Sequence, residues 1–334
     1  MHINKIAKPK RSIFYDAYWQ FAAKRFDVFE RRLNNQPAPW TDDLVIANNR
    51  FTNVFRASDR VSQYLINLQY ENDDLKDVFF KTMLFKLFNK IETYTFLDKE
   101  LAVINAEAFS FDTYDRLLTQ RLSEGTIYSA AYIIPSAGSA FGYKFKHTNH
   151  LALLDKMMKD ELYKKMTDSK SLAEVYRLLL SYPSLGPFLA FQFTIDLNYS
   201  ELLSFSEMDF VVAGPGAKNG ILKCFESLGS YSFEDVIKLM TDDQEKECER
   251  LGLKLPNLWG RRLQLIDCQN LFCETDKYLR ATNPESNNKS GRTRIKQKFS
   301  KSKGPMSFFF PPKWNINNQI NIACQKIKNE GIFS

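Results

Sequence analysis

The sequence has few glycines, few histidines and no long uninterrupted apolar run. Gly accounts for 13 of 334 residues and Phe for 28, and the apolar positions recur at helical spacing instead of alternating. The longest apolar stretch, residues 185–195, is interrupted by Gln192 and is too short to cross a bilayer. Residues 1–12 carry four basic side chains and lack the apolar core of a secretory signal. We therefore expect an all-α, soluble, cytoplasmic protein without a membrane partner.

Cysteine and histidine are too sparse for a redox or metal centre. The five cysteines are odd in number and include no C-x-x-C pair, which predicts reduced thiols and excludes a four-cysteine iron–sulfur cluster: Cys224, Cys248, Cys268, Cys273 and Cys324. Of the three histidines, His147 and His150 can share a helix face but lack further ligands. The G-x-x-x-x-G-K-[ST] spacing of a phosphate-binding loop is missing, which disfavours ATP hydrolysis. No metal and no cofactor is expected.

Positive charge is concentrated near the C-terminal end. The net charge is +7, and residues 289–303, KSGRTRIKQKFSKSK, contain seven Lys or Arg and no acid. This composition cannot form a core, and it suits either a solvated linker or a strand that follows nucleic acid phosphates. We place Lys289, Arg292 and Arg294 among the phosphate contacts, and predict that residues 281–334 form a basic, partly irregular segment that docks on the body through its FFF run.

Helical periodicity dominates the rest of the chain, without an internal repeat. The predicted helices cover residues 14–33, 51–65, 74–98, 111–122, 150–166, 171–181 and 263–280, and an irregular loop covers residues 126–145. Thr41 or Asp42 is a candidate N-cap after the Pro-rich turn. In the segment 51–65, Asn53, Arg56, Arg60 and Gln63 are predicted to share a polar helical face.

A Pro-x-x-Gly turn within residues 183–187 is the first candidate site. Gly186 permits a tight turn, and the amides after it can hold a phosphate oxygen at a helix N-terminus. Asp209 follows 23 positions later, in a polar loop. A carboxylate so placed can stabilise an oxocarbenium-like sugar during cleavage of an N-glycosidic bond, although it can equally cap the next helix. Helix-hairpin-helix DNA glycosylases combine such a turn with such an aspartate.

Two further groups of residues are alternative candidate sites. The turn GPGAKNG has Gly214, Gly216 and Lys218 and can cradle a phosphate. In a competing register Lys218 is an amine nucleophile and Asp267 its carboxylate. On the predicted helix 263–280 a charged stripe includes Asp267, Asn270, Glu274, Lys277 and Tyr278, and it serves equally as a salt-bridge network or as a pocket wall.

The chain resembles a known family over residues 13–280. The blocks PWTDD, RFTNVFRASDRVSQYL, FKLFNKIETY, AAYIIPS, PSLGPFLAFQFTIDLNY, DFVVAGPGAKNGI and DCQNLFCETDKYLR are similar to the α-glutamyl/putrescinyl thymine pyrophosphorylase group and to the helical domain of 5-hydroxymethyluracil DNA kinases. The resemblance implies a helix-hairpin-helix glycosylase-like helical domain over residues 13–280, which can divide into two lobes flanking a DNA cleft, and work on hypermodified pyrimidines of phage DNA.

Within that resemblance, Gly186 matches the hairpin glycine and Asp209 the catalytic aspartate. The Schiff-base lysine of bifunctional glycosylases falls on Phe188, which cannot form an imine, so this register predicts a monofunctional enzyme. Phe188, Gly214 and Gly216 join Gly186 as phosphate-binding candidates.

The leading hypothesis is a monomeric DNA glycosylase that flips and excises a bulky modified pyrimidine, such as glucosylated 5-hydroxymethylcytosine, from double-stranded phage DNA in anti-phage defence. The candidate base pocket consists of Asn53, Arg56, Tyr132, Gln192, Gln269, Asn270 and Lys277, with Asp209, Lys218 or Asp267 as catalytic groups. The alternative is a tailoring enzyme that attaches an amine or amino acid to activated 5-hydroxymethyluracil by pyrophosphorylase-type transfer. A DNA-binding adaptor for modified bases is a third hypothesis.

Overall fold

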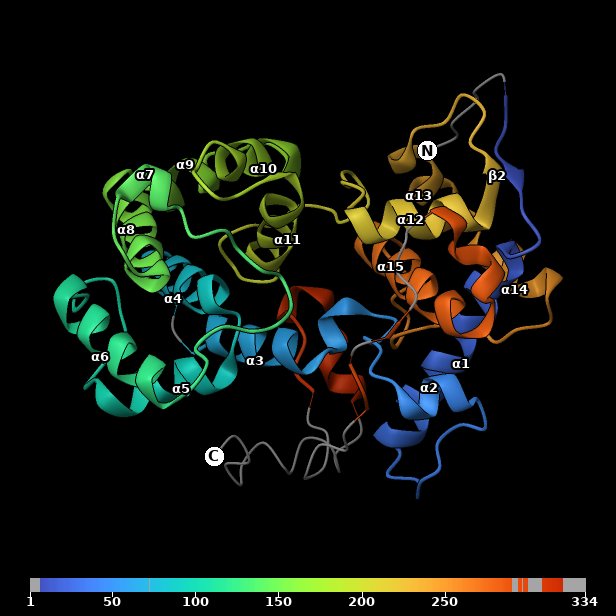
Figure 1. The fold of residues 1–334 in the computed structure, drawn as a ribbon, viewed down its shortest axis with the longest axis horizontal. Coiled ribbons are helices and arrows are strands. Elements are labelled where there is room, and N and C mark those ends of the chain that lie inside the picture. Colours follow the sequence, from blue (N-terminus) through green and yellow to red (C-terminus); the bar gives the residue numbers. More distant parts are fainter. Residues whose placement is uncertain (1–6, 72, 290–293, 296, 300–307, 321–334) are drawn as a thin grey trace. The chain divides into compact units, whose positions relative to one another are not determined.

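The computed structural model describes residues 7–71, 73–289, 294–295, 297–299 and 308–320, with the side chains of residues 287–289 left undescribed (Figure 1). These residues are mostly helical, which confirms the predicted all-α class. The chain divides into two compact units: unit 1 is Met1–Asp59 with Val211–Ser334, and unit 2 is Arg60–Phe210. The more specific likeness to glycosylases and the boundary at residue 280 stay predictions.

Unit 1 combines the two ends of the chain. Its helices and strands are β1 (Lys10–Arg11), α1 (Tyr15–Leu33), α2 (Leu44–Asn48), η1 (Arg56–Ser58), α12 (Pro215–Cys224), β2 (Phe225–Ser227), α13 (Phe233–Asp242), α14 (Gln244–Arg250), α15 (Leu265–Thr282), η2 (Pro284–Lys289), η3 (Pro312–Trp314) and η4 (Asn317–Gln319). The antiparallel pair β1 and β2, with Lys10 opposite Ser227, joins the N-terminal segment to the end of α12.

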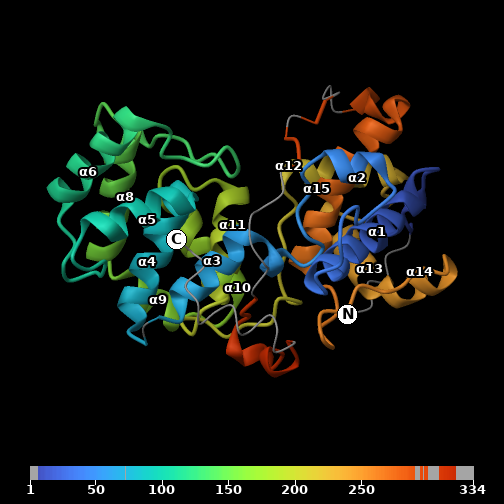
Figure 2. The same ribbon diagram turned by 90° about the horizontal axis from the view of Figure 1, so that it is seen from below.

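Helix α15 is the centre of unit 1. Helices α1, α2, α12 and α13 all contact it and lie around it in both ribbon views (Figures 1 and 2). Helix α12 approaches most closely, because two glycines one turn apart remove the side chains that would hold it off. A Cβ on Gly220 would lie 2.0 Å from the carbonyl oxygen of Phe272, and one on Gly216 would lie 3.0 Å from Sγ of Cys273. Residues 215–220, predicted to be a turn, are therefore helical and form a packing surface.

A buried ion pair also joins these two helices. Lys223 Nζ of α12 lies 3.0 Å from Oδ1 of Asp276 on α15, and both side chains are 1% exposed. Arg280 approaches the other carboxylate oxygen at 3.3 Å. Two cations compensate one buried carboxylate, which offsets the cost of removing these charges from water.

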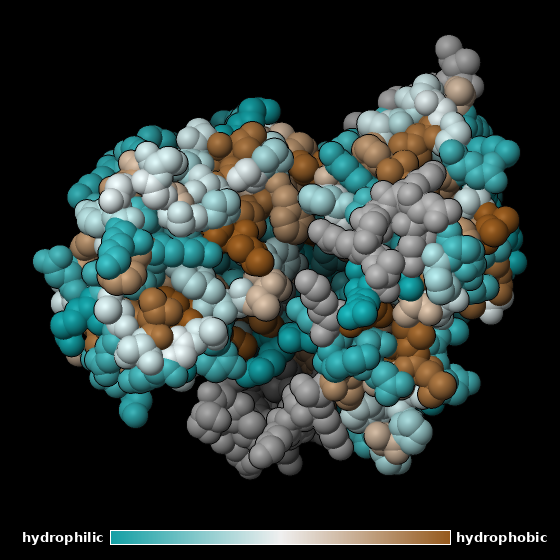
Figure 3. All heavy atoms as spheres, viewed as in Figure 1, coloured by the Kyte–Doolittle hydropathy of each residue, from teal (hydrophilic) through white to brown (hydrophobic). Residues whose placement is uncertain are grey.

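Unit 2 is a helical bundle with a single large apolar cluster. Its helices are α3 (Arg60–Gln69), α4 (Leu75–Phe88), α5 (Ile91–Glu100), α6 (Phe111–Glu124), α7 (Gly138–Phe141), α8 (Lys146–Lys159), α9 (Leu162–Thr167), α10 (Leu172–Leu180) and α11 (Pro187–Asn198). Phe79, Phe80, Phe193 and Leu154 are among the fully buried side chains of this cluster. On the face of unit 2 seen in Figure 3, teal polar side chains cover most of the surface between smaller brown patches.

The described part of the C-terminal segment packs on unit 1. Phe308 contacts Phe29, with ring centroids 5.3 Å apart, and Phe310 contacts Trp259 at 5.8 Å. The guanidinium of Arg261 lies 3.7 Å from the ring centroid of Trp314. These are aromatic and cation–π contacts within unit 1. The docking of the whole segment 281–334 stays a prediction.

Three predicted helices differ from the structure. One of them, 150–166, is divided into α8 and α9 at Glu161, which adopts a left-handed conformation with φ 49°. Residues 51–59 are irregular apart from the single 3-10 turn η1, and α3 begins only at Arg60, so the four predicted residues do not share a helical face: Asn53, Arg56, Arg60 and Gln63. The reason is tertiary, since side chains of α15 satisfy the backbone amides of this segment. The pattern 74–98 is broken at Asn89, which adopts a left-handed conformation with φ 50° and separates α4 from α5.

The remaining local expectations are mostly met. The N-cap of α2 is Asp43, one residue beyond the predicted candidates, and its carboxylate accepts from the amides of Val45 and Ile46. Cys224, Cys248, Cys268 and Cys273 are free thiols, whereas Cys324 lies outside the described residues. In the described part of the chain no helix is long and apolar enough to cross a bilayer.

Candidate functional site on helix α15

An extended loop, residues 49–59, follows one face of α15. The backbone N–H of Arg56 donates to Oδ1 of Asp267 over 2.8 Å, and the N–H of Thr52 donates to Oε2 of Glu274 over 3.0 Å. Asn270 lies between these two acceptors on the same helical face, by the i, i+3, i+7 spacing. We call this loop, together with Asp267, Asn270, Glu274 and Lys277, the polar seam.

Asp267 lies at the end of the polar seam where α15 begins. It is the third residue of α15, and its Oδ2 accepts from the N–H of Gln264 over 3.0 Å to form a capping box. Its Oδ1 is occupied by Arg56, and the side chain is only 4% exposed. This carboxylate holds the helix start and the loop together.

At the other end of the polar seam, an ion pair lies against an aromatic ring. Lys277 Nζ lies 2.7 Å from Oε2 of Glu274, and both side chains are less than one-fifth exposed. The ammonium also lies 4.7 Å from the ring centroid of Phe51, a cation–π distance. Tyr278 packs on Phe21 and donates its hydroxyl to Asp43 over 2.7 Å.

The loop itself contains a second carboxylate. Oδ1 of Asp59 accepts from the N–H of Asn53 over 2.7 Å, and Arg25 Nη2 donates to the Asn53 side chain over 2.5 Å. Burial raises the pKa of Asp59 to about 6, against the opposing effects of the Asn53 amide and Arg25. Burial likewise lowers the pKa of Arg25 to about 10. A carboxyl group with a pKa near 6 can exchange protons close to neutral pH.

Four buried polar atoms of this region have no hydrogen-bond partner within the protein. They belong to the loop and to the two helices beside it: Arg25 Nη1, Thr52 Oγ1, Ser58 Oγ and Asn270 Nδ2. An orphaned buried donor costs about 1–3 kcal/mol, so several in one place mark a site that binds water or a ligand. Thr52, Asn53 and Asp59 are partly exposed and give this region access to solvent.

Unit 2 holds a separate buried polar cluster. Lys86 Nζ lies 3.0 Å from Oδ2 of Asp196, with exposures of 3% and 1%, and donates to Oδ1 of Asn89 over 2.7 Å. The same ammonium lies 5.1 Å from the ring centroid of Tyr132, which stacks on Phe188 at 5.8 Å. The cluster thus links α4, α11 and the irregular segment before α7.

The structure brings together four of the seven predicted base-pocket residues. Asn53, Arg56, Asn270 and Lys277 belong to the polar seam. Gln269 lies on α15 outside the seam and is fully buried, with its Nε2 at 3.4 Å from Sγ of Cys273.

The two other base-pocket candidates lie in unit 2. Tyr132 is next to Lys86, and Gln192 is fully buried on α11. Neither residue belongs to the polar seam.

The predicted catalytic groups occupy different environments. Asp209 is exposed in the loop after α11, and its backbone N–H bonds to the carbonyl of Ser206 over 3.4 Å. Lys218 is exposed on α12, with Nζ 5.4 Å from the ring centroid of Phe233. Asp267 is buried in the capping box described above. Their catalytic roles stay predictions.

The predicted phosphate contacts are equally varied. Gly186 is the exposed N-cap of α11 with φ −68°, so the left-handed residue of that turn is Ser184, with φ 66°. Gly214 is the N-cap of α12. Gly216 packs against Cys273, and Phe188 stacks on Tyr132.

Of the basic candidates, Arg294 is exposed, and its carbonyl accepts from Arg280 over 3.2 Å. Arg292 and the side chain of Lys289 lie outside the described residues.

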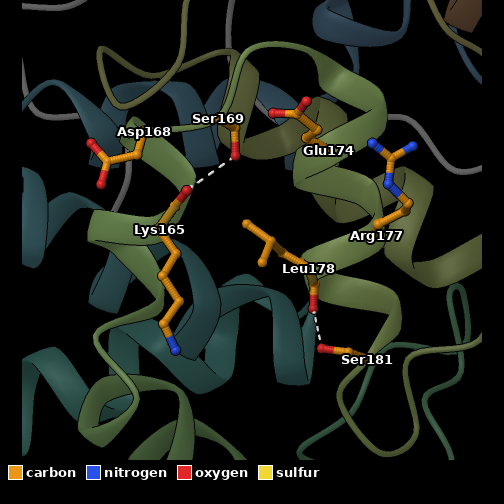
Figure 4. Close-up of a pocket in the computed structure, with 7 residues that line it drawn as sticks. All are labelled: Lys165, Asp168, Ser169, Glu174, Arg177, Leu178 and Ser181. Carbon is orange, nitrogen blue, oxygen red and sulfur yellow. Dashed lines mark hydrogen bonds between the residues drawn. The ribbon is translucent and has the colours of Figure 1, made fainter.

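A shallow depression of about 420 Å³ lies between α9 and α10 (Figure 4). The hydroxyls of Ser169 and Ser181 donate to the backbone carbonyls of Lys165 and Leu178. The lining combines two cations, two carboxylates, two hydroxyls and a leucine: Lys165, Asp168, Ser169, Glu174, Arg177, Leu178 and Ser181. This mixed and largely exposed lining indicates no chemistry.

Several residues escaped the sequence reasoning. Arg25 gives no local signal, because it follows the ordinary pattern of an amphipathic helix. Asp196 does give one, since it is the lone charge in the apolar helix PFLAFQFTIDLN, and Lys86 gives a weaker one, since it lies within the apolar run TMLFKLF of α4. Charges in such positions are buried and need partners.

Comparison with known proteins identifies relatives. A family model described as "5-hmdU DNA kinase, helical domain" matches residues 12–288. The chain is also 29% identical over 290 residues to the 5-hmdU DNA kinase of Bacillus phage SP10, an alignment that covers 79% of this chain and 44% of that protein. The chain therefore spans less than half the length of this relative. No solved structure matches it.

These findings correct the leading functional hypothesis. The expectation of a DNA glycosylase, a hydrolase that flips and excises a modified base in anti-phage defence, is wrong, because the matched relative is a DNA kinase, a transferase. They agree better with the alternative of a base-modification enzyme. They also confirm the resemblance drawn from the seven sequence blocks: the chain belongs to the family of 5-hmdU DNA kinase helical domains.

Proposed function

We propose that this protein modifies 5-hydroxymethyluracil in DNA, as a transferase that replaces an activated hydroxyl on the base with an amine or amino acid. The observation that carries the proposal is the match of residues 12–288 to the helical domain of 5-hmdU DNA kinases. A kinase of that name activates the hydroxymethyl group, and a second reaction must consume the activated product. The proposal assigns this second reaction to the helical residues that match the family model.

The chemistry takes place at the edge of the base. The C5 substituent of a pyrimidine projects away from the glycosidic bond, on the major-groove side. In the proposed step the amine nitrogen attacks the C5 methylene carbon, the carbon–oxygen bond breaks, and diphosphate leaves with the electron pair. The nitrogen loses one proton to a base. The glycosidic bond and the DNA backbone stay intact.

We assign this step to the polar seam. Asp59, with its pKa raised to about 6, is suited to accept the proton from the incoming amine. Lys277 supplies a cation for the departing diphosphate. The Asn270 amide, with its buried orphan N–H donor, is complementary to a carbonyl oxygen of the uracil edge.

The test uses oligonucleotides that contain 5-hydroxymethyluracil or its diphosphate ester, single-stranded and duplex, with glutamate or putrescine as nucleophile. Mass spectrometry of the nucleosides is expected to show the aminated product from the ester, with release of diphosphate and without strand breaks after alkali. Free base and an abasic site would refute the proposal. If the protein phosphorylates the unesterified 5-hydroxymethyluracil with ATP, it is a kinase and not the proposed transferase.

The carboxylate assignment has its own test. The Asp59→Asn variant keeps an acceptor for Asn53 but cannot take a proton, so its rate of transfer is expected to fall about 100-fold or more. Asp209→Asn and Asp267→Asn are the comparison variants. A loss confined to Asp209→Asn would move the role of the base to Asp209.

A further inference from the structure

Part of the basic tract is fixed against the start of the polar seam. The N–H of Arg50 donates to the carbonyl of Gln297 over 3.0 Å, and the N–H of Phe299 donates to the carbonyl of Asn48 over 3.1 Å. Lys298 pairs with Asn49 in an antiparallel bridge, and its Nζ lies 3.3 Å from Oδ1 of that residue. Residues 297–299 therefore extend the wall of loop 49–59 by a short strand.

This arrangement creates an aromatic surface. Phe299 is 37% exposed, and its ring meets that of Trp40 edge-on, with centroids 6.3 Å apart. Trp40 is itself partly exposed and is held in place by a hydrogen bond from Nε1 to the carbonyl of Gln36 over 2.8 Å. Leu44, at the start of α2, is 74% exposed. Single exposed apolar side chains are ordinary, but neighbouring ones that form a patch often mark a binding site.

The rim of this surface is positively charged. The guanidinium of Arg32 lies 5.1 Å from the ring centroid of Trp40, and the side chains of Arg50 and Lys298 are exposed. The tract that continues on either side of Lys298 has seven Lys or Arg and no acid in residues 289–303. Two acids follow Trp40 in the sequence: Asp42 is exposed, and Asp43 is compensated by Lys24 at 2.9 Å and by the hydroxyl of Tyr278. The net field favours a polyanion.

We propose that Trp40, Phe299, Arg32, Arg50 and Lys298 form a docking surface for single-stranded DNA. Fixed aromatic rings flanked by cations are the arrangement by which proteins hold single strands without sequence preference, because each base offers a flat face for stacking while the cations follow the phosphates. In a continuous duplex the base faces are stacked inside the helix and only the phosphates are accessible. Its bases therefore cannot stack on Trp40 or Phe299. The inference deepens the proposed function, since it names the form of DNA that reaches the polar seam.

Binding is measured by fluorescence anisotropy with a labelled, unmodified oligodeoxythymidylate, and with a duplex of mixed sequence, in the absence of any nucleophile. The variants Phe299→Ala and Trp40→Ala are each expected to weaken single-strand binding at least about fivefold. Trp40→Phe is expected to retain most of the affinity, because it keeps a ring. Arg50→Glu is expected to flatten the dependence of log affinity on log salt.

Matched controls lie in unit 2. Phe145→Ala removes an aromatic ring that is 42% exposed, and Arg116→Glu reverses an exposed charge. Both are expected to bind like the parent protein, and thermal unfolding verifies that all variants are folded. Unchanged affinity in Phe299→Ala, equal loss in Phe145→Ala, or tighter binding of the duplex would overturn the proposal. The binding assay involves no reaction. A protein that binds single-stranded DNA but transfers no amine would therefore refute the proposed function and leave the docking surface standing.

Discussion

Lys86 and Asp196 form an ion pair of 3.0 Å in the apolar interior of unit 2, where their side chains are 3% and 1% exposed. Removing one partner leaves an uncompensated charge among Phe and Leu side chains. We expect Lys86→Met to lower the free energy of unfolding by about 3–5 kcal/mol, measured by urea denaturation. The double variant Lys86→Met/Asp196→Leu should recover much of this loss.

The control for this pair is exposed. Lys159 and Asp155 lie 2.6 Å apart, but the lysine side chain is 74% exposed. Lys159→Met should therefore change stability by less than about 1 kcal/mol. A similar effect of both substitutions would show that the Lys86 pair is not buried in solution.

Gly220 and Gly186 are expected to respond oppositely to alanine. A methyl group on Gly220 would collide with the backbone oxygen of Phe272, so Gly220→Ala should destabilise the protein by about 3 kcal/mol or more. Gly186 has open space around it and a φ of −68°, so Gly186→Ala should stay within about 0.5 kcal/mol of the parent. Thermal or urea unfolding of the two variants checks the contrast. Strong destabilisation by Gly186→Ala would assign that glycine a role the structure does not explain.

His150 makes the stability of unit 2 dependent on pH. The ring is fully buried; its Nε2–H donates to the carbonyl of Pro135 over 2.8 Å, and its Nδ1 accepts from the hydroxyl of Tyr128 over 3.0 Å. Burial lowers its pKa from 6.5 to about 4. The folded state therefore binds fewer protons than the unfolded state between these values. Stability should be complete above pH 6.5 and fall by up to about 1.4 kcal/mol per pH unit as the pH drops toward 4.

The measurement is urea unfolding across this range for the parent and for His150→Gln. The variant should be less stable near neutral pH, because it loses shape and contacts, and should have a flatter profile on acidification. His147→Gln is the companion variant, since burial also lowers the pKa of His147. An unchanged slope in His150→Gln would show that another group causes the acid sensitivity.

Substitution of Asn270 is expected to affect stability and transfer differently. Replacing it with Leu removes a buried N–H donor that lacks a partner in the protein, so stability should be unchanged or rise by about 1 kcal/mol. If the polar seam binds the base, transfer in the same variant should fall at least about tenfold.

Thr275→Val is the matched control for Asn270→Leu. The Thr275 hydroxyl is also a buried orphan of α15, but its position lies on another helical face. It should affect stability in the same direction and leave transfer unchanged. A parallel loss of activity in both variants would point to a general disturbance of α15.

The sequence predicted the helices better than the seam. Helices α1, α6, α10 and α15 follow from apolar spacing, and Ser171 caps α10 at the predicted start. Residues 51–59 have the same periodicity but are not helical, because Asp267 and Glu274, more than 200 positions away, take their amide hydrogens. No local pattern contains that information.

The same limit explains why the glycines after residue 213 were predicted to form a phosphate-binding turn. Gly214 and Gly216 suggested a phosphate turn, because glycine is common in both turns and close helix contacts. The spacing of Gly216 and Gly220 by one helical turn was the signal for packing, and only the partner, Phe272 and Cys273 of α15, distinguishes the two uses. In contrast, Asn53, Arg56, Asn270 and Lys277 were chosen for their polar chemistry, and they meet in one place.

The bridge between Asn49 and Lys298 affects any deletion mapping of this protein. A shortened chain that stops before residue 297 loses the carbonyl that receives the Arg50 amide and the amide that reaches the Asn48 carbonyl. Such a truncation removes positive charge and also loosens the segment that leads into Asn53 and Asp59. Point substitutions of the lysines and arginines, with the backbone left in place, are therefore the proper way to separate the tract's charge from its part in the architecture.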